Sequence, residues 1–487
     1  MPRKNPTQIT ILLCLCGLWL FPWGTATAQT KETPARITAV IEEGKLVRLT
    51  GNVHPLARAE FDRGGVADAV PMSRMLLLLK RSDEQESALQ DYLESQQDKN
   101  SPNYQRWLSP QEFGAQFGPA DADIQKVTNW LQAKGFDVAR VYAGKTVIEF
   151  SGTAGRVATA FGTQIRNYQL DRKTYIANAS DPAIPAALAP VVAGVVSLNN
   201  FPRKNFSKYT GTIRKYEGMT GEEPLFTFPF LSRPGNFYGL APGDFATIYN
   251  SQTLISTGND GTGQTIAIVG ETNINLQDVK DFRTIFGLPA NFDASNIILN
   301  GEDPGITSRG EEAEADLDIQ WSGATAPGAT IKYVLSASTP ASAGVDLSAL
   351  YIIEHNLAGV MSESYGECEN HLGATGNAFF NSLWQQAAAQ GITVIVSSGD
   401  GGSAGCDNFN ASRVATKGLA VSGLASTPYN VSLGGTDFDE INTWTKYWNQ
   451  TNDATGTSAK SYIPEIPWNE NCSQLGLTGC GPGAPHG

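Results

Sequence analysis

Histidine is scarce in this sequence, with only four in 487 residues. None of them lies in a motif such as His-Gly-Thr, and the first long apolar run ends in Val269-Gly270-Glu271 rather than in Asp-Thr-Gly or Asp-Ser-Gly. A Ser-His-Asp triad needs a histidine as its general base, and an aspartic protease needs Asp-Thr/Ser-Gly. The sequence therefore supports neither mechanism.

Basic residues are also few. The chain has 35 Lys and Arg against 48 Asp and Glu, so its net charge is -13. Nucleic acids and anionic membranes attract basic surfaces, so we expect neither as a partner. The apolar run at residues 9–21 falls short of the roughly 20 residues that span a bilayer. It follows Arg3 and Lys4 and precedes Ala26-Thr27-Ala28, a pattern typical of a secretory signal peptide cut after Ala28. A membrane anchor is the alternative; we expect a secreted protein, extracellular or periplasmic.

Cysteines are few, and two of the six, Cys14 and Cys16, would leave with the signal peptide. An even number remains in an exported chain, so disulfides are plausible. Three connectivities are possible, and we favour the one that closes the shortest loops. No Cys-x-x-Cys pair exists, which makes a zinc site the weaker alternative. The favoured pairs are Cys368–Cys406 and Cys472–Cys480.

The rest of the chain divides into three segments by composition. Residues 29–201 alternate helical and strand patterns in an order that fits helices on one face of a small antiparallel sheet. Residues 202–236 are rich in Pro, Gly and basic residues, which predicts an exposed linker open to proteolysis. Residues 237–487 contain apolar strands that alternate with helices, which predicts a parallel sheet covered on both faces.

The stretch EAEADLDIQW, residues 312–321, carries an acid at every second position. Its good helix formers predict a helix rather than a strand. A helical wheel places Glu314 and Asp318 beside an apolar stripe, whereas Glu312 and Asp316 point to water and Ile319 faces outward. Two partly buried acids one turn apart raise one another's pKa and can share or pass a proton. The alternative is an acidic helix start stabilised by the helix dipole. The predicted stripe consists of Ala313, Leu317, Trp321 and Ala324.

A second candidate is the loop SSGDGGSAGC. Ser398, Gly399 and Asp400 follow a buried strand directly, and binding sites in parallel sheets lie beyond the carboxyl ends of strands. The alternative is a glycine-rich turn in which Asp400 bonds its own backbone.

Several blocks together resemble the sedolisin (kumamolisin-type) serine-carboxyl peptidases. They are EADLDIQWSGATAPGATI, SYGECE, AAAQGITVIVSSGDGGSAGCD and SYIPEIPWNENC, preceded by YQRWLSPQEFGAQFG, FSGTAGRVATAFGTQI and IPAALAPVVAGVVSL. The resemblance implies an α/β subtilisin-like parallel sheet, incomplete at its C-terminus, preceded by an α+β ferredoxin-like prodomain. It divides the chain into a signal peptide (1–28), an activation prodomain (29–201), a linker with the maturation cleavage (202–236) and a partial peptidase domain (237–487).

The resemblance also implies roles for individual residues. Glu314 would be the general base of a Ser-Glu-Asp triad, Asp318 would orient it, and Asp400 would be a protonated oxyanion-hole acid. A carboxylate base suits acid pH, where histidine is already protonated. The strand at Ser364-Tyr365-Gly366 would pair with extended substrate beside Ser398 and Gly399. Glu363 receives no role.

The sequence departs from the family pattern at the nucleophile. Ser458 lies in Gly-Thr-Ser, but Pro464 follows it by six residues instead of four, and the motif precedes SYIPEIPWN instead of following it. We therefore expect Ser458 not to be the nucleophile, and the true serine and the family's calcium ligands to lie beyond Gly487 in a truncated or partial sequence.

These observations predict a secreted zymogen of an acid-acting endopeptidase that forms an acyl-enzyme. Its expected partners are protein or peptide substrates and its own prodomain as an intramolecular inhibitor, and we expect a monomer. A non-catalytic truncated homologue that binds peptides or a partner protease is the alternative. A two-carboxylate glycosidase is disfavoured, because its acids come from separate strand ends rather than from one helical turn.

Overall fold

The computed structural model describes residues 33–170, 172–205, 228–229, 236–237, 239–407, 416–440 and 443–467. The expected signal peptide, most of the expected linker, Cys472 and Cys480 lie outside these residues. The chain divides into Met1–Pro34 and Ala35–Gly487, and the second unit holds every element below. None of its described helices is both long and apolar enough to cross a bilayer.

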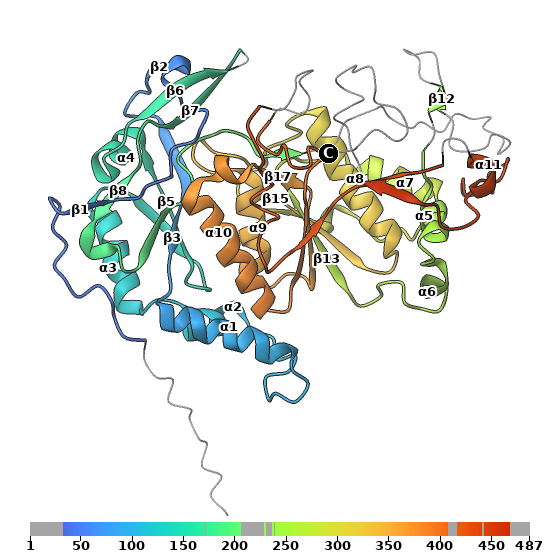
Figure 1. The fold of residues 1–487 in the computed structure, drawn as a ribbon, viewed down its shortest axis with the longest axis horizontal. Coiled ribbons are helices and arrows are strands. Elements are labelled where there is room, and N and C mark those ends of the chain that lie inside the picture. The colour runs from blue at the N-terminus through green and yellow to red at the C-terminus, as the bar shows by residue number, and fades with distance from the viewer. Residues whose placement is uncertain are drawn as a thin grey trace, which may run out of the picture. The chain divides into compact units, whose positions relative to one another are not determined.

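The N-terminal region is built on a four-stranded antiparallel sheet with the order β4-β5-β3-β9. Along the chain these strands alternate with helices as strand, helices, strand, strand, helix, strand (Figure 1). The capping boxes of α1 and α2 begin at Ser82 and Ser109, whose side chains accept the N–H groups of Gln85 and Glu112. The elements are β3 (Pro71–Leu79), α1 (Asp83–Gln97), α2 (Pro110–Phe117), α3 (Asp121–Ala133), β4 (Asp137–Val141), β5 (Val147–Thr153), α4 (Ala154–Phe161) and β9 (Val192–Val195).

Two smaller sheets complete this region, one of three strands in the order β2-β6-β7 and one that pairs β1 with β8. All of their pairings are antiparallel. Their strands are β1 (Leu46–Arg48), β2 (Asp62–Gly65), β6 (Ile165–Leu170), β7 (Lys173–Asn178) and β8 (Ala183–Pro185).

The C-terminal region contains a six-stranded parallel sheet in the order β14-β15-β13-β16-β18-β19. In β13, Ala267 and Val269 join one apolar cluster with α9 and α10, whereas Ile268 joins another with α7 and α8. Alternate side chains of a strand point to opposite faces, so helices cover both faces, as predicted. The elements are β13 (Thr265–Gly270), α7 (Leu276–Ile285), β14 (Ile297–Leu299), α8 (Arg309–Thr325), β15 (Thr330–Leu335), α9 (Gly344–Glu354), β16 (Val360–Glu363), α10 (Glu369–Ala389), β18 (Thr393–Ser397) and β19 (Val431–Leu433).

Short elements flank this sheet. Ile248 of α5, Tyr447 of α11 and Trp448 pack in one small apolar cluster with Ile463. The elements are β10 (Lys204–Asn205), β11 (Phe228–Pro229), β12 (Asn236–Phe237), α5 (Pro242–Ile248), α6 (Gln252–Ser256), β17 (Tyr365–Gly366), β20 (Thr436–Phe438), α11 (Trp444–Tyr447) and β21 (Glu465–Pro467).

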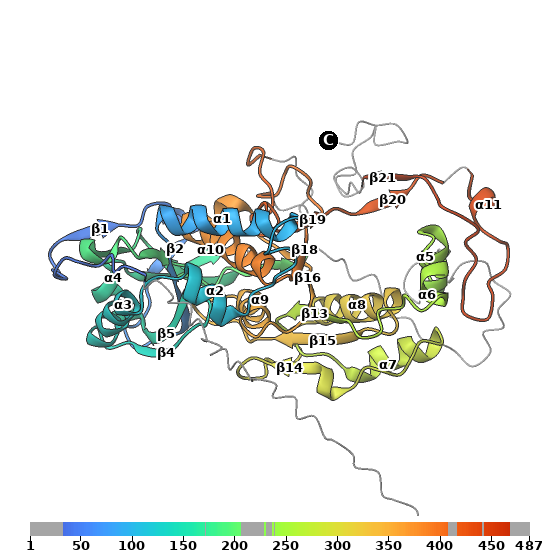
Figure 2. The ribbon, with the colours of Figure 1, turned by 90° about the horizontal axis from the view of Figure 1, so that it is seen from below.

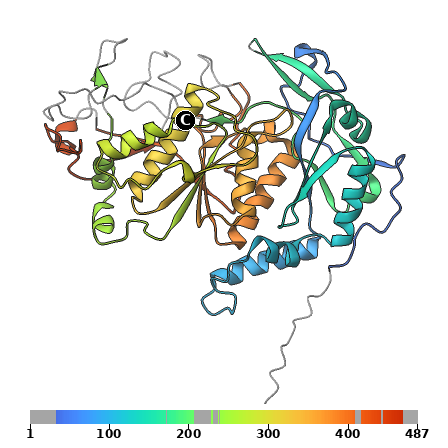
Figure 3. The same cartoon turned by 180° about the vertical axis from the view of Figure 1, so that it is seen from behind.

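The two regions share buried side chains through β3. Leu77 and Leu79 pack with α3 and α4 of the N-terminal region, whereas Leu76 and Leu78 pack in the cluster that contains Phe379 and Trp384 of α10. Helix α10 also contacts α1, α2 and β9 (Figures 2 and 3). One face of the N-terminal sheet is therefore covered by its own helices and the other by the C-terminal region.

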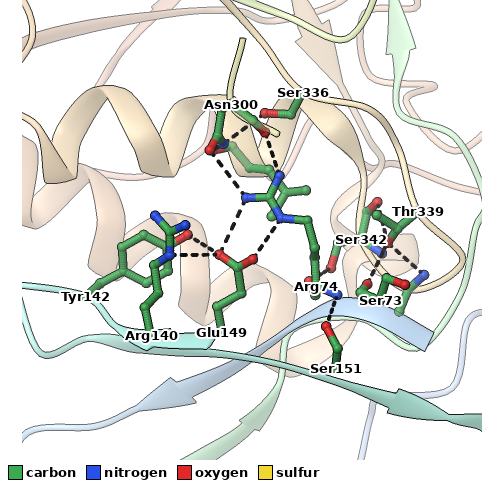
Figure 4. Close-up of polar contacts among 12 residues, drawn as sticks. Ser73, Arg74, Arg140, Tyr142, Glu149, Ser151, Asn300, Ser336, Thr339 and Ser342 are labelled. Atoms are coloured by element: carbon green, nitrogen blue, oxygen red, sulfur yellow. Dashed lines mark hydrogen bonds and ion pairs between the residues drawn. The ribbon is translucent and has the colours of Figure 1, made fainter. Parts of the chain in front are cut away.

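Arg74 contributes a charged side chain to the same contact between the two regions. It lies at the bulge of β3 with a φ of 54°, and its Nε donates to Glu149 Oε1 at 2.8 Å while its Nη1 donates to the carbonyl of Asn300 at 2.7 Å (Figure 4). The Tyr142 hydroxyl donates to Glu149 Oε2 at 2.5 Å. Burial favours the neutral form of Glu149, but the hydrogen bonds from Arg74 and Tyr142 hold its pKa below the usual value. The Arg74–Glu149 pair within the N-terminal sheet is therefore ionised, and the hydrogen bond from Arg74 to Asn300 links it to the C-terminal region.

Helix α10 receives a cap from the N-terminal region. The helix is interrupted at Gly373, which has a φ of 69°, and the next residue, Ala374, donates its N–H to the carbonyl of Gly51 at 2.8 Å. A Cβ at position 373 would lie 2.5 Å from that carbonyl oxygen. Glycine therefore fits position 373 for two reasons: it tolerates the left-handed backbone conformation, and it lets the loop at Gly51 approach closely.

We predict that Arg74→Ala lowers the free energy of unfolding by about 3 kcal/mol, because it leaves the buried Glu149 carboxylate without its main partner. The urea midpoint of the whole chain measures this loss. Arg48→Ala is the matched control, since Arg48 is exposed and makes only a 3.4 Å hydrogen bond to the Asp181 carbonyl. Equal midpoints for the two variants would show that Arg74 does not hold the regions together.

Candidate active site

Helix α8 carries the acids that the sequence singled out. It begins after Ser308, whose side chain accepts the N–H of Glu311, and it runs to Thr325. Helix was the correct prediction, but of the predicted apolar stripe only Ala324 is buried, so the stripe as a whole was wrong. Ile319, expected to face outward, is fully buried, and Leu317 is 44% exposed. The buried face follows Ala315, Ile319 and Gly323, because this face packs on β13 and β15.

The prediction that Glu312 and Asp316 lie in water was also wrong. Both side chains are only partly exposed. Burial, with the charges of Asp278 on α7 and of Glu312, raises the pKa of Asp316 to about 7. The error arises because α7 packs along α8, which a wheel of one isolated helix does not show.

Glu314 and Asp318 do form an acid pair at the buried side of α8. Glu314 is 5% exposed, and the Ser364 hydroxyl donates to Asp318 Oδ1 at 2.8 Å. Burial raises the pKa of Asp318 well above its ordinary value, the charge of Glu314 raises it further, and the hydrogen bond from Ser364 opposes both effects. Two carboxyl groups with this coupling can hold one proton between them.

The segment Ser364-Tyr365-Gly366 lies directly beside this pair. The hydroxyl of the buried Tyr365 donates to Glu311 Oε2 at 2.9 Å, so two successive side chains bind α8. The short strand β17 that follows pairs antiparallel with β10, with Lys204 opposite Gly366 and Asn205 opposite Tyr365. The edge expected to bind substrate is therefore paired with the chain's own segment.

That pairing corrects the predicted linker. Residues 202–236 were expected to be exposed, yet Arg203 is buried and its guanidinium forms an ion pair with Asp346 on α9. Composition could not reveal this contact, because the partner lies 143 residues away in the sequence. The other described residues of the linker are Pro202, the two residues of β10 (Lys204–Asn205), the two residues of β11 (Phe228–Pro229) and Asn236 of β12.

The loop at Ser398-Gly399-Asp400 begins where β18 ends. Gly399 has a φ of 92°, a conformation that favours glycine, and the Ser398 N–H donates to the carbonyl of Leu433 at 2.9 Å. Because β18 is parallel to β16, this loop and Ser364 lie beyond the same edge of the sheet. The structure thus places the three residues at the expected edge, and the role of Asp400 stays a prediction.

A further acid, which sequence reasoning passed over, lies at the same edge. Glu271 follows β13 and is 9% exposed, and Ser338 donates its hydroxyl to Glu271 Oε2 at 2.7 Å. Burial, then the charges of Glu311 and Asp346, raise the pKa of Glu271 to about 7 against the opposing hydrogen bond from Ser338. Its position directly after a buried strand is the signal that could have found it.

A disulfide joins Cys368 and Cys406, the pair that the loop lengths favoured. Two groups of side chains among the described residues have metal-binding donors close together, Cys368–His371–Cys406 and His54–Glu367–His371. The sulfurs of the first are joined to one another, and the second offers a single carboxylate. Calcium requires six to eight oxygen ligands, so neither group fits it, and the calcium expected from the family stays a prediction.

The fold and this site define a class: an α/β protein with a paired-carboxylate site at the edge of a parallel sheet, preceded by a separate antiparallel sheet. The family model described as Pro-kumamolisin, activation domain, matches residues 61–201. Sedolisin of Pseudomonas sp. (strain 101) is 28% identical over 410 residues, which cover 83% of this chain and 64% of sedolisin. Kumamolisin of Bacillus sp. (strain MN-32) is 26% identical over 447 residues, 89% of this chain and 75% of kumamolisin.

Two further similarities were found. Xanthomonalisin of Xanthomonas sp. (strain T-22) is 25% identical over 507 residues, 97% of this chain and 57% of that protein. The solved structure of Pseudomonas sedolisin with pseudo-iodotyrostatin has 26% sequence identity and a TM-score of 0.33, and the match covers 47% of this chain and 63% of that one. Residues 61–201 thus match the activation domain of the pro-kumamolisin type, and the chain is similar over most of its length to sedolisin, kumamolisin and xanthomonalisin. It spans under two thirds of the length of sedolisin and of xanthomonalisin.

The raised pKa of Glu271 predicts a pH-dependent stability. The folded pKa of about 7 exceeds the ordinary 4.5, so ionisation destabilises the folded state increasingly as the pH rises from about 4 to above 7. Glu271→Gln removes this penalty and should raise the free energy of unfolding by about 2–3 kcal/mol at pH 8 and by little at pH 4. Urea unfolding at both values measures it, with the exposed Glu94→Gln as control. A gain of the same size at both values would contradict the assignment.

Proposed function

We propose that this protein is the secreted zymogen of an acid-acting serine-type endopeptidase with a subtilisin-like fold. It would hydrolyse peptide bonds through an acyl-enzyme and a Ser-Glu-Asp triad. The observation that carries the proposal is the coupled pair Glu314–Asp318 on α8, held against the strand edge by the hydrogen bond from Ser364. The strand order β4-β5-β3-β9 supports a ferredoxin-like prodomain.

Glu314 would accept the proton of the attacking serine hydroxyl and later return it to the leaving amine. For this it must be ionised while the substrate binds, so its neighbour Asp318 holds the shared proton, which the raised pKa of Asp318 favours. Asp400, in its neutral form, would donate a hydrogen bond to the oxygen that becomes negative in the tetrahedral intermediate. Both roles suit acid pH, at which a histidine base is protonated.

We assign no nucleophile among the described residues. Ser458 is 1% exposed, and its N–H and that of Ala459 both donate to Asp244 Oδ1, at 2.6 and 2.7 Å. These contacts tie the segment to α5, a structural role that supports the view that Ser458 is not the catalytic serine.

The prodomain would inhibit through the segment that follows it, which would occupy the substrate edge. A peptide that adds a strand to an exposed edge binds through its main chain, and β10 makes this kind of pairing with β17. The calcium of the family would bind elsewhere, and no step proposed here depends on it.

We predict that Glu314→Gln lowers the rate of hydrolysis of a denatured protein between pH 3 and 6 by about 10²–10⁴-fold, because it removes the general base. The assay uses the chain together with any coding sequence that follows Gly487. Glu312→Gln, two residues away on the same helix, is the matched control and should retain activity, as should Ser458→Ala.

An acid-dependent activity that survives Glu314→Gln but disappears in Ser458→Ala would overturn the proposed triad. Binding of peptides without hydrolysis at any of these pH values would instead favour a non-catalytic homologue.

A further inference from the structure

The guanidinium of Arg203, the residue before β10, lies among buried acids, and this group of side chains is called the pocket below. Its Nε and Nη2 donate to the two carboxylate oxygens of Asp346, at 3.0 and 2.7 Å. Arg203 is 6% exposed, and Asp346, in the first turn of α9, is 1% exposed. Two parallel hydrogen bonds from a planar guanidinium to one carboxylate form the strongest and most geometrically selective ion pair available to a side chain.

Asp346 is not the only acid around this guanidinium. Glu363, Glu367 and Glu271 also interact with its charge, and all three are buried. Glu367 accepts a hydrogen bond from His371, whereas neither carboxylate oxygen of Glu363 has a hydrogen-bond partner among the residues described. Lys204 and, when protonated, His371 are the other cationic groups nearby, whereas burial lowers the pKa of His54 to about 3 and keeps its ring neutral. The acids thus outnumber the cations that enter the pocket.

The pocket adjoins the strand that we expect to bind substrate. Glu363 ends β16, and Ser364 and Tyr365 follow it. Ser364 binds Asp318 on α8, whereas the fully buried carboxyl group of Glu363 interacts with the charges of Asp346 on α9 and of Arg203. A peptide paired with Tyr365 and Gly366 in the register of β10 would place the residue that corresponds to Arg203 beside Asp346.

We propose that Asp346 and Glu363 form a substrate subsite for an arginine side chain, which Arg203 fills in the zymogen. The subsite takes the side chain one residue before the residue that pairs with Gly366. This inference rests on the proposed function only in calling the occupant a substrate; the pocket itself can be tested without catalysis. Arginine is preferred to lysine, because only the guanidinium makes both hydrogen bonds to Asp346.

The first test empties the pocket in the whole chain and refills it with a small cation. Arg203→Ala should lower the melting temperature by about 5 °C or more, because Asp346 is left buried and unpaired. Millimolar ethylguanidinium should restore part of the loss, and its neutral analogue ethylurea should not. Adding Asp346→Asn should abolish the rescue, whereas the exposed Asp91→Asn should leave it intact. Rescue by ethylurea to the same extent, or rescue that survives Asp346→Asn, would overturn the proposal.

Arg203→Ala alone risks misfolding, so refolding from urea provides a second readout. A variant that refolds in higher yield with ethylguanidinium than with ethylurea supports the pocket. A variant that refolds equally in both, or in neither, contradicts it.

The second test measures whether the pocket binds a peptide and distinguishes arginine from citrulline. An acetylated, fluorescent peptide of residues 201–205, Phe-Pro-Arg-Lys-Asn, is titrated into the Arg203→Ala chain, beside the same peptide with citrulline in place of arginine. The arginine peptide should bind about tenfold more tightly, because citrulline keeps the shape but loses the charge. Equal binding would overturn the subsite. Selective binding without any peptidase activity would leave the subsite standing and refute only the proposed function.

Discussion

The burial of both faces of strand β3 is the constraint on which the rest of the structure depends. Its consecutive leucines divide between two cores: Leu77 and Leu79 pack under helices of the N-terminal region, and Leu76 and Leu78 pack against α10 of the C-terminal region. Separation of the N-terminal region would expose this second face to water, at a cost of roughly 25 cal/mol for each Å² of apolar surface. The two regions therefore stabilise one another, and polar contacts such as that of Arg74 fix their register instead of supplying most of the free energy.

The second constraint is the placement of acids at the edge where the parallel strands end. Glu271 follows β13, Glu363 ends β16, and Asp318 faces Ser364 between β16 and β17. Burial raises the pKa of each of these groups, so each destabilises the fold when it ionises and ceases to do so in acid. Acids placed in this way destabilise the fold least at acid pH. At that pH a carboxyl group can serve both as a base and as a hydrogen-bond donor. The scarcity of histidine and the chemistry of the edge are consistent with one another.

The elements were more predictable than their environments. The apolar runs at 265–270, 330–335 and 393–397 form inner strands of the sheet, since continuous apolar runs of this length are typical of strands buried on both faces. Helix α8 was predictable from its residues, but the exposure of Leu317 and the burial of Ile319 were not, since the sheet and α7 together decide which face is covered. The burial of Arg203 could not be predicted from the sequence for the same reason. Its basic, proline-rich surroundings are typical of a linker, and only a distant carboxylate makes the arginine part of the core.

The shortness of β10 explains why a side chain must hold it. Only two residues pair with β17, and each main-chain hydrogen bond contributes about 0.5–1.5 kcal/mol net, which is too little to keep a segment on a water-exposed edge. The ion pair of Arg203 with Asp346 both attracts the segment and positions it. Its two hydrogen bonds fix the plane of the guanidinium and thereby the register in which the next two residues pair with β17. A peptide that competes for this edge likewise gains little free energy from its main-chain hydrogen bonds. Its main chain binds weakly and without sequence preference, so the side chain that reaches the buried acids decides which peptide stays.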